Sequence, residues 1–344
     1  MSDAPVKLRW LIAHRPEHLF VRTAQAFAKE LDELLPGQFV IEILNQGKYI
    51  SRYGIDESWP EVNWVPRPVE GLEKSDSSPE REFVDWDNGV RRIHKAFYKA
   101  MGNQKIHLSQ TQITHIGGVY DEYSTLDLPF LFNDHDHVSR ALDGKIGDEL
   151  NARLAENTEV RGLAFTYSGG YRIVGSNEPI DSIDSLKTLG ITTVPTTREF
   201  FNSLSGNAKS RVEQTRDELK QLAEKGSAIE TTYLRFDGKN VLKTNHSMFL
   251  TNIIISNSFF DSLTEEQQNA FRTAAKRVAK LERQWSLDDA EQYEAEAESK
   301  GIKIAEVSES ETAKMREAAV QQYKFTFQKI PSSLDLVKKI KNLQ

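Results

Sequence analysis

Arg172 is the side chain in this sequence best suited to recognise an anion. It follows Gly169 and Gly170, lies in the apolar run LAFTYSGGYRIV (residues 163–174), and has no acidic residue near it in sequence. A buried guanidinium without a partner is costly, so this side chain needs a carboxylate. That carboxylate belongs either to an acid elsewhere in the fold or to a ligand, which the planar guanidinium can hold through two parallel hydrogen bonds.

Two further groups of polar residues have types that bind ligands. The run Asp134–His137 (DHDH) offers metal-ligand types, but neighbours on a helix do not face one another, so we interpret it as a helix cap with a solvated first turn. His14, Glu17 and His18 follow the first predicted strand, where α/β folds place ligand contacts. A capping or surface position is the alternative for these three residues.

Motifs for catalysis are absent from the sequence. It has no G-x-S-x-G elbow, no phosphate-binding loop and no H-E-x-x-H pair, which are the signatures of common hydrolases, nucleotide enzymes and metalloproteases. We therefore predict that the protein is not an enzyme and needs no metal or cofactor. Hydrolysis by a pair of carboxylates is the enzyme alternative, because 51 acidic residues offer many pairs.

Composition narrows the class of protein. A chain of 344 residues is long enough for two domains. The net charge of -7 and the lack of a basic stripe argue against a nucleic-acid partner. The absence of cysteine excludes disulfides and thiolate nucleophiles. We expect a periplasmic protein that lacks its signal peptide and is not membrane-embedded, because no apolar segment approaches about 20 residues.

Apolar periodicity predicts the elements that must position Arg172. Strands are expected over residues 7–13, 39–44, 105–114 and 247–256, and helices over 20–35, 87–101 and 134–157. A very long helix is predicted to begin with a capping box at Ser262 and Glu265 and to run to about Lys300, a length of about 55 Å. Residues 54–85, which contain Trp59 and Trp64, read as a long insertion.

Four segments in this order resemble one known family. They are AHRPEHLFVRTAQAFAKEL (13–31), LDLPFLFNDHDHVSRALDGKIGDEL (126–150), RGLAFTYSGGYRIVGSNEPIDSIDSLKTLGITTVP (161–195) and TNHSMFLTNIIISNSFFDSLTEEQQNAFRTAA (244–275). Their order and spacing are similar to those of the extracytoplasmic solute receptors of TRAP transporters, the DctP-like family. The resemblance covers most of the chain apart from the insertion and the C-terminal tail.

The resemblance implies an α/β receptor with two lobes, joined by hinge-crossing strands and braced by the long helix. Residues 1–168 with 245–282 would form one lobe, and residues 169–244 with 283–344 the other. A small-molecule solute, usually an organic acid, would bind between the lobes, close them, and pass to the membrane permease subunits. Arg172 would sit where these receptors hold a carboxylate. A homodimer through the long helix is an open expectation.

Three departures from the family pattern affect the expected site. Relatives usually carry a second arginine in a leucine-lysine-isoleucine-arginine-valine-proline strand, but here Thr193 takes that place, and a hydroxyl has neither the charge nor the fork of a guanidinium. Arg198 is expected either to reach over instead or to be an exposed residue at a helix start. In place of the usual aspartate-glycine-glutamine-glutamate-asparagine run stands AIETTYLRF (228–236). The third departure is the insertion.

The replacement run and the insertion supply further candidate contacts. Glu230, Tyr233 and Arg235 are candidates in the replacement run, with packed core as the alternative for Tyr233. Trp59 and Trp64 would cover or occupy the site. We predict an atypical solute, bulkier or less charged than usual. The alternative is an interaction or sensor protein with an altered or blocked cleft, whose inserted loop docks a partner.

Overall fold

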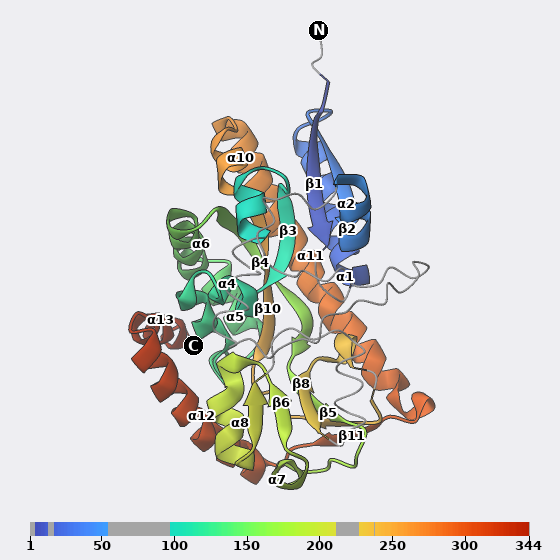
Figure 1. Cartoon of the computed structure of the whole chain (residues 1–344), viewed down its shortest axis with the longest axis vertical. Coiled ribbons are helices and arrows are strands. Elements are labelled where there is room, and N and C mark those ends of the chain that lie inside the picture. The colour runs from blue at the N-terminus through green and yellow to red at the C-terminus, as the bar shows by residue number, and fades with distance from the viewer. Residues whose placement is uncertain (1–3, 13–16, 54–96, 211–226, 237, 344) are drawn as a thin grey trace, which may run out of the picture.

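The computed structural model describes residues 4–12, 17–53, 97–210, 227–236 and 238–343 (Figure 1). The predicted insertion 54–85, with Trp59 and Trp64, lies outside these residues, and so does His14. Of the helix expected over 87–101, only the end is described, and residues 97–102 are helical. Among the described residues no helix is both long and apolar enough to cross a bilayer.

The first lobe is built on a five-stranded sheet of order β2-β1-β3-β10-β4. β1 is parallel to β2 and β3, whereas β10 is antiparallel to β3 and β4. All nine residues of β10 are buried, which confirms the strand predicted over 247–256. The strands are β1 (Val6–Ile12), β2 (Phe39–Asn45), β3 (Leu108–Gln112), β4 (Val160–Tyr171) and β10 (Met248–Ser256).

Helices cover both faces of this sheet. One face packs on α1 and the first half of α11 through an aromatic core that includes Phe27, Phe39 and Phe271. The other face packs on short helices and on the C-terminal helix α13. These helices are α1 (Glu17–Leu34), α2 (Gln46–Tyr53), α4 (Ile113–Gly117), η1 (Asp121–Asp127), α5 (His135–Leu142), α6 (Lys145–Asn157), α10 (Asn257–Asp261) and α13 (Ser333–Lys341).

The second lobe is built on a six-stranded sheet of order β11-β9-β5-β8-β6-β7. α7, α8 and α12 cover one of its faces, with Phe200, Phe201 and Met315 in the core. The strands are β5 (Ile173–Ser176), β6 (Ile191–Thr193), β7 (Ala208–Ser210), β8 (Ala228–Thr231), β9 (Asn240–Lys243) and β11 (Lys303–Glu306). The helices are α7 (Ser185–Leu189), η2 (Pro195–Thr197), α8 (Arg198–Ser205), η3 (Tyr233–Arg235), η4 (Glu298–Lys300) and α12 (Glu309–Lys329).

The chain crosses between the two sheets in two strand segments that lie side by side. β4 of the first sheet runs directly through Arg172 into β5 of the second, and β9 of the second sheet leads through residues 244–247 into β10 of the first. The two crossings are joined where the backbone N–H of Arg172 donates to the carbonyl of Ser247 over 2.8 Å. Arg172 therefore sits at the junction of the lobes. The two-lobed α/β class is confirmed, while the predicted lobe boundaries stay a prediction.

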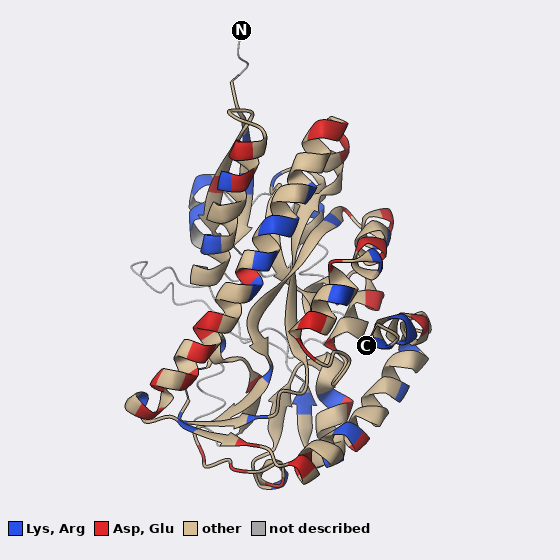
Figure 2. Cartoon of the chain, turned by 180° about the vertical axis from the view of Figure 1, so that it is seen from behind, with Lys and Arg blue, Asp and Glu red and all other residues tan. Residues whose placement is uncertain are grey.

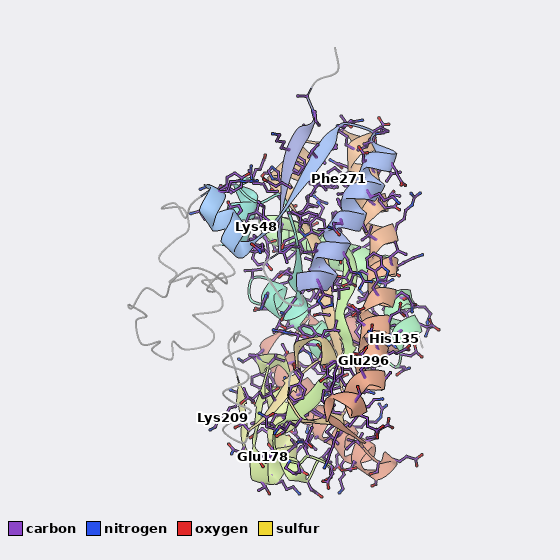
Figure 3. All side chains as sticks on the ribbon, turned by 90° about the vertical axis from the view of Figure 1, so that its right-hand side faces the viewer. Lys48, His135, Glu178, Lys209, Phe271 and Glu296 are labelled. Atoms are coloured by element: carbon purple, nitrogen blue, oxygen red, sulfur yellow. The ribbon has the colours of Figure 1, made fainter. Side chains whose placement is uncertain are left out.

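α11 (Glu265–Ala297) is the third element that spans both lobes (Figure 1). Its 33 residues give a length of about 50 Å. The predicted cap at Ser262 and Glu265 is wrong. Thr264 is the N-cap residue, and its reciprocal partner is Gln267, because Ser262 ends the preceding helix α10. Figure 3 labels Phe271 and Glu296, which lie far apart along this helix.

Charge is segregated along α11 after an acidic first turn of Glu265 and Glu266: its basic side chains lie between Arg272 and Arg283, and acidic ones follow toward its end (Figure 2). In the first lobe Arg277 binds Glu30 over 3.1 Å. In the second, Glu294 binds Lys243 of β9 over 3.0 Å. Solvated pairs of this kind add little stability individually, but the basic middle section of α11 pairs with the first lobe and its acidic end with the second.

The helix predicted over 134–157 is interrupted. α5 ends at Leu142 and α6 begins at Lys145, with Gly144 between them as N-cap. Gly147 packs so closely on the Leu142 carbonyl that an added Cβ would lie 2.0 Å from its oxygen. The tight turn lets both helices pack on the same side of the sheet, a consequence of tertiary packing that apolar periodicity alone does not show.

The strand β4 is irregular where it approaches Arg172. Its register against β10 shifts between Tyr167 and Tyr171. Side chains of α11 satisfy the displaced amides, because the N–H of Tyr167 donates to Glu282 over 2.8 Å and that of Gly169 to Ser286 over 2.7 Å. The long helix thus fixes the crossing strand at its bend.

Gly169 is required at this bend, because its φ is +94° and an added Cβ would lie 2.7 Å from Thr232 Oγ1. We expect Gly169→Ala to lower the free energy of unfolding by about 3 kcal/mol through strain and overlap. Gly301→Ala is the matched control, since Gly301 has a φ of +70° with no atom within 4 Å. It should cost about 1 kcal/mol. Equal losses in urea unfolding would contradict a steric role for Gly169.

Glu282 should make the stability of the crossing pH-dependent. Burial raises the pKa of its carboxyl to about 8, although hydrogen bonds from Tyr167 and Gln110 and the charges of Arg283 and Arg22 oppose the rise. The folded state therefore binds this proton more tightly than the unfolded chain, and stability falls as pH rises from about 4.5 to 8.

We expect Glu282→Gln to remove this loss, because the amide stays neutral at every pH. Between pH 5 and pH 8.5 the stability of the variant relative to the natural protein should rise by about 3 kcal/mol in urea unfolding. Glu291→Gln, the same change at an exposed position of α11, is the control. If the difference in stability between Glu282→Gln and the natural protein is the same at pH 5 and at pH 8.5, Glu282 is ionised at both pH values.

Candidate functional site

Arg172 is enclosed at the junction of the two lobes. Its side chain is 1% exposed, although guanidinium groups are almost never fully buried without partners. The guanidinium carbon lies 4.1 Å from the ring centroid of Phe249 on β10, which is the geometry of a cation–π contact. The bend at Gly169 and Gly170 turns the strand just before Arg172 and so directs the side chain into this site.

Two carboxylates of the chain itself neutralise Arg172. Its Nη2 lies 3.4 Å from Asp127 Oδ1, and its Nε lies 3.7 Å from Glu230 Oε1. Both acids are fully buried. The sequence left two alternatives for the partner of Arg172, a ligand or an acid elsewhere in the fold. These ion pairs correspond to the second alternative. The pairs are loose, because Nε has no hydrogen-bond partner among the described residues. We call Arg172, Asp127, Glu230 and His246 the Arg172 cluster.

Glu230 is held by a dense set of hydrogen-bond donors. Its Oε2 accepts from the hydroxyls of Thr193 and Thr197 (2.7 Å for Thr197) and from the backbone N–H of Val194 over 2.8 Å. Its Oε1 accepts from His246 Nε2 over 3.1 Å. The donors come from β6, η2 and the segment before β10. A carboxylate with this many donors is strongly favoured in its charged form.

The protonation states in the cluster follow from these contacts. Burial acts to raise the pKa of Glu230, but the hydrogen bond from His246 and the charge of Arg172 outweigh it and hold that pKa well below its usual value. Burial lowers the pKa of His246 despite the neighbouring Glu230. His246 is therefore a neutral imidazole that donates from Nε2, while its Nδ1 accepts from the Thr244 hydroxyl over 2.8 Å.

Asp127 is the weaker acid of the pair. Burial raises its pKa, Arg172 opposes the rise, and the nearby Glu230 adds to it. Its Oδ2 accepts from the hydroxyls of Thr114 and Thr196 over 3.3 and 3.2 Å. The cluster thus combines one cation, one firmly ionised carboxylate and one carboxyl whose ionisation is held back.

The structure brings together only part of the predicted site. Arg172 and Thr193 meet through Glu230. Arg198 begins α8 and donates twice to its neighbour Glu199, over 2.9 and 2.7 Å. Tyr233 packs in the second-lobe core with its ring 5.1 Å from that of Tyr293. Their roles as solute contacts stay predictions.

The remaining predicted site residues begin a described helix or lie outside the described residues. Glu17 is the first residue of α1, and Trp59 and Trp64 lie outside the described residues. His18 is exposed and lies 3.5 Å from Asp289 of α11. Their proposed contacts with a solute are untested.

The DHDH run forms the predicted helix cap, but the first turn is not wholly solvated, because His137 is buried. Asp134 accepts from the backbone N–H of His137 over 2.7 Å at the start of α5. His137 Nε2 donates to the carbonyl of Ile340 over 2.8 Å, and His135 Nδ1 lies 3.2 Å from the Tyr167 hydroxyl. Within the described part of the chain, no three acidic or histidine side chains are placed to hold a metal ion.

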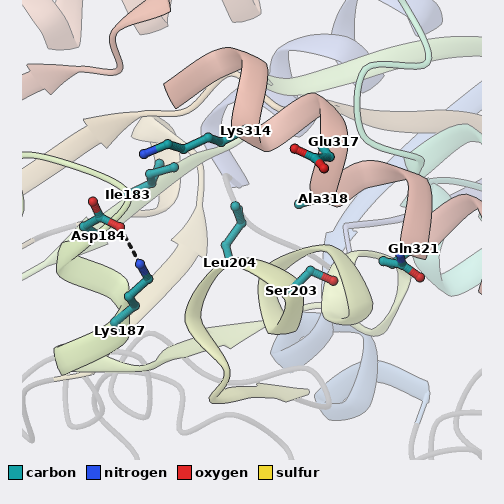
Figure 4. A pocket seen from close by; sticks show the side chains of 9 residues that line it. All are labelled: Ile183, Asp184, Lys187, Ser203, Leu204, Lys314, Glu317, Ala318 and Gln321. Atoms are coloured by element: carbon teal, nitrogen blue, oxygen red, sulfur yellow. Dashed lines mark hydrogen bonds and ion pairs between the residues drawn. The ribbon is translucent and has the colours of Figure 1, made fainter. Parts of the chain in front are cut away.

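A separate groove of about 620 Å³ lies on the second lobe (Figure 4). It is formed by α7, α8 and α12 and contains a Lys187–Asp184 ion pair of 2.7 Å. It shares no residue with the Arg172 cluster, and its wall is solvated surface, so we do not assign it as the site. The residues that line it are Ile183, Asp184, Lys187, Ser203, Leu204, Lys314, Glu317, Ala318 and Gln321.

Sequence reasoning missed two members of the cluster, Asp127 and His246. Asp127 lies in LDLPFLFND, a buried connection in which an acid needs a partner. His246 lies two residues before the apolar strand β10. These signals mark each residue as buried and polar, but only the tertiary structure shows that Asp127 pairs with Arg172 and that His246 binds Glu230.

The fold and the cluster define the class as a two-lobed binding protein with crossing strands at the junction. The family model for bacterial extracellular solute-binding proteins, family 7, DctP, matches residues 88–212 and 224–330. The chain belongs to this family. It is a TRAP-type solute receptor, as the sequence resemblance predicted, and the family accords with the predicted periplasmic location.

Individual relatives agree with this assignment. The 2,3-diketo-L-gulonate-binding periplasmic protein YiaO of Escherichia coli is 24% identical over 255 residues, or 70% of this chain and 75% of YiaO. A TRAP periplasmic solute-binding protein of Desulfovibrio desulfuricans with bound sn-glycerol-3-phosphate has a TM-score of 0.76 at 17% identity, covering 98% and 97% of the two chains. A Chromohalobacter salexigens protein with bound D-glucuronate has a TM-score of 0.74 at 17% identity, covering 98% and 100%.

We expect Thr193→Val to destabilise the protein by about 2 kcal/mol, because it removes a hydrogen bond to a buried charge at nearly constant volume. Thr312→Val is the matched control, since that hydroxyl makes an exposed bond to the Ser308 carbonyl. It should cost less than about 0.5 kcal/mol. Urea unfolding of both variants is the measurement. A loss at Thr193 no larger than at Thr312 would show that the Glu230 contact contributes little.

Proposed function

We propose that the protein captures a hydroxylated organic acid between its two lobes, beside the Arg172 cluster, and delivers it to the permease subunits of a TRAP transporter. The observation that carries this proposal is the meeting of both crossing segments at Arg172, next to a buried charge cluster. A solute bound there would contact groups from both lobes and so favour one relative placement of the lobes.

The solute class is supported by the relatives. YiaO is named for 2,3-diketo-L-gulonate, and solved structures of other family members hold D-glucuronate and β-D-galacturonate. These compounds combine one carboxylate with several hydroxyls. We therefore take a carboxylate that carries several hydroxyls as the proposed solute class.

We propose no catalytic role, because the relatives are solute-binding proteins. Arg172, Thr193, Arg198, Tyr233, Glu17, Trp59 and Trp64 remain the proposed neighbours of the solute. A homodimer remains an expectation from the sequence without further support. The interaction or sensor alternative is not favoured, since the named relatives above are receptors for solutes.

Thermal unfolding with a panel of solutes tests this proposal. Glucuronate, galacturonate and gulonate should be compared with glucose, galactose and glycerol, which share the hydroxyls but lack the carboxylate. A bound acid at about 100 times its dissociation constant should stabilise the protein by about 2.7 kcal/mol, while its neutral counterpart gives little change. If neither acids nor neutral sugars raise Tm, the proposed solute class is wrong.

A further inference from the structure

The donors around Glu230 form a complete carboxylate-binding site. Two hydroxyls, one backbone N–H and one imidazole N–H converge on its two oxygens, and a guanidinium lies 3.7 Å away. Uncharged groups supply all four of these hydrogen bonds, and Arg172 supplies charge. Proteins use the same combination to bind the carboxylates of small molecules. Here the occupant is a side chain of the protein.

We propose that Glu230 is a built-in occupant of this carboxylate site, and that it decides specificity by keeping the carboxylate of a solute away from Arg172. The inference deepens the proposed function and rests on it. The acid group of the solute then binds elsewhere between the lobes, and its neutral, hydroxylated part faces the cluster.

Electrostatics excludes a further anion at this position. Arg172 already has Asp127 and Glu230 as partners, so its positive charge is compensated in the absence of a solute. A further carboxylate would meet the ionised Glu230 in a buried site, where like charges repel strongly, and its charge would hold back the ionisation of Asp127 still more. Phe249 covers a face of the guanidinium and leaves no open side there.

The loose geometry of the ion pairs favours this interpretation over a pair selected for stability. An arginine that serves as a structural anchor is typically held by two short parallel bonds. Here the Arg172–Glu230 separation is 3.7 Å, and Nε lacks a hydrogen-bond partner among the described residues. The short bonds of Glu230 go to Thr193, Val194 and Thr197 and not to Arg172.

Truncation of Glu230 provides a direct test. Glu230→Ala removes Cγ and the carboxyl group, which together have the size and charge of one acetate ion. We expect acetate to bind this variant at least tenfold more tightly than it binds the natural protein. Its binding should raise Tm saturably by about 3 °C or more, measured against chloride at equal ionic strength.

Two controls restrict the result to this site. Pivalate, a carboxylate too bulky for the space of one side chain, should not stabilise Glu230→Ala. Glu230→Ala combined with Thr193→Val lacks one donor and should bind acetate at least fivefold more weakly than Glu230→Ala. If Glu230→Ala folds only when acetate is present, that dependence is itself the expected result.

Three results would overturn the inference. They are equal acetate affinity in the natural protein and the variant, rescue by chloride as well as by acetate, and failure of the variant to fold in either medium. None of these arms uses the natural solute. Rescue without any binding of sugar acids would count against the proposed function alone, and binding of sugar acids without rescue would count against the role of Glu230 alone.

Discussion

A buried positive charge at the crossing of two strands is the constraint on which this structure depends. Arg172 cannot be hydrated, because it is 1% exposed, and so the chain must bring acids to it from both lobes. Asp127 arrives from the first lobe and Glu230 from the second. The compensation of one charge therefore joins the lobes at the point where the crossing strands meet, and their relative placement is coupled to the ionisation of the cluster.

The long helix α11 supports the same crossing of the strands. Glu282 and Ser286 of α11 bind the backbone N–H groups of Tyr167 and Gly169, where the register of β4 shifts shortly before Arg172. The helix also packs in the aromatic core of the first lobe and against Tyr233 of the second. A movement of one lobe relative to the other would change these contacts. We therefore expect the bend in β4 and the Arg172 cluster to move together.

The chemistry of the cluster sets this receptor apart from a simple arginine clamp. In such a clamp the hydrogen-bond donors of the guanidinium are free until they bind the carboxylate of a ligand. Here Glu230 already fills a site built from Thr193, Val194, Thr197 and His246. The replacement of an arginine by Thr193 belongs to the same arrangement, because a hydroxyl can donate to Glu230 whereas a second guanidinium would add a charge in need of its own partner.

The sequence by itself determined the family, the two-lobed α/β class and the elements on either side of Arg172. These depend on local periodicity and on motifs in a fixed order, such as the apolar run of β10 and the SGGYR corner. The sequence also showed that Arg172 needs an acidic partner. Only the tertiary structure decided which acids those are, because Asp127 and Glu230 lie 45 and 58 positions from Arg172 and meet it only through the crossing of the two segments. The break between α5 and α6 and the cap at Thr264 were likewise decided by packing. The periodicity of the sequence does not show which residues a turn packs against.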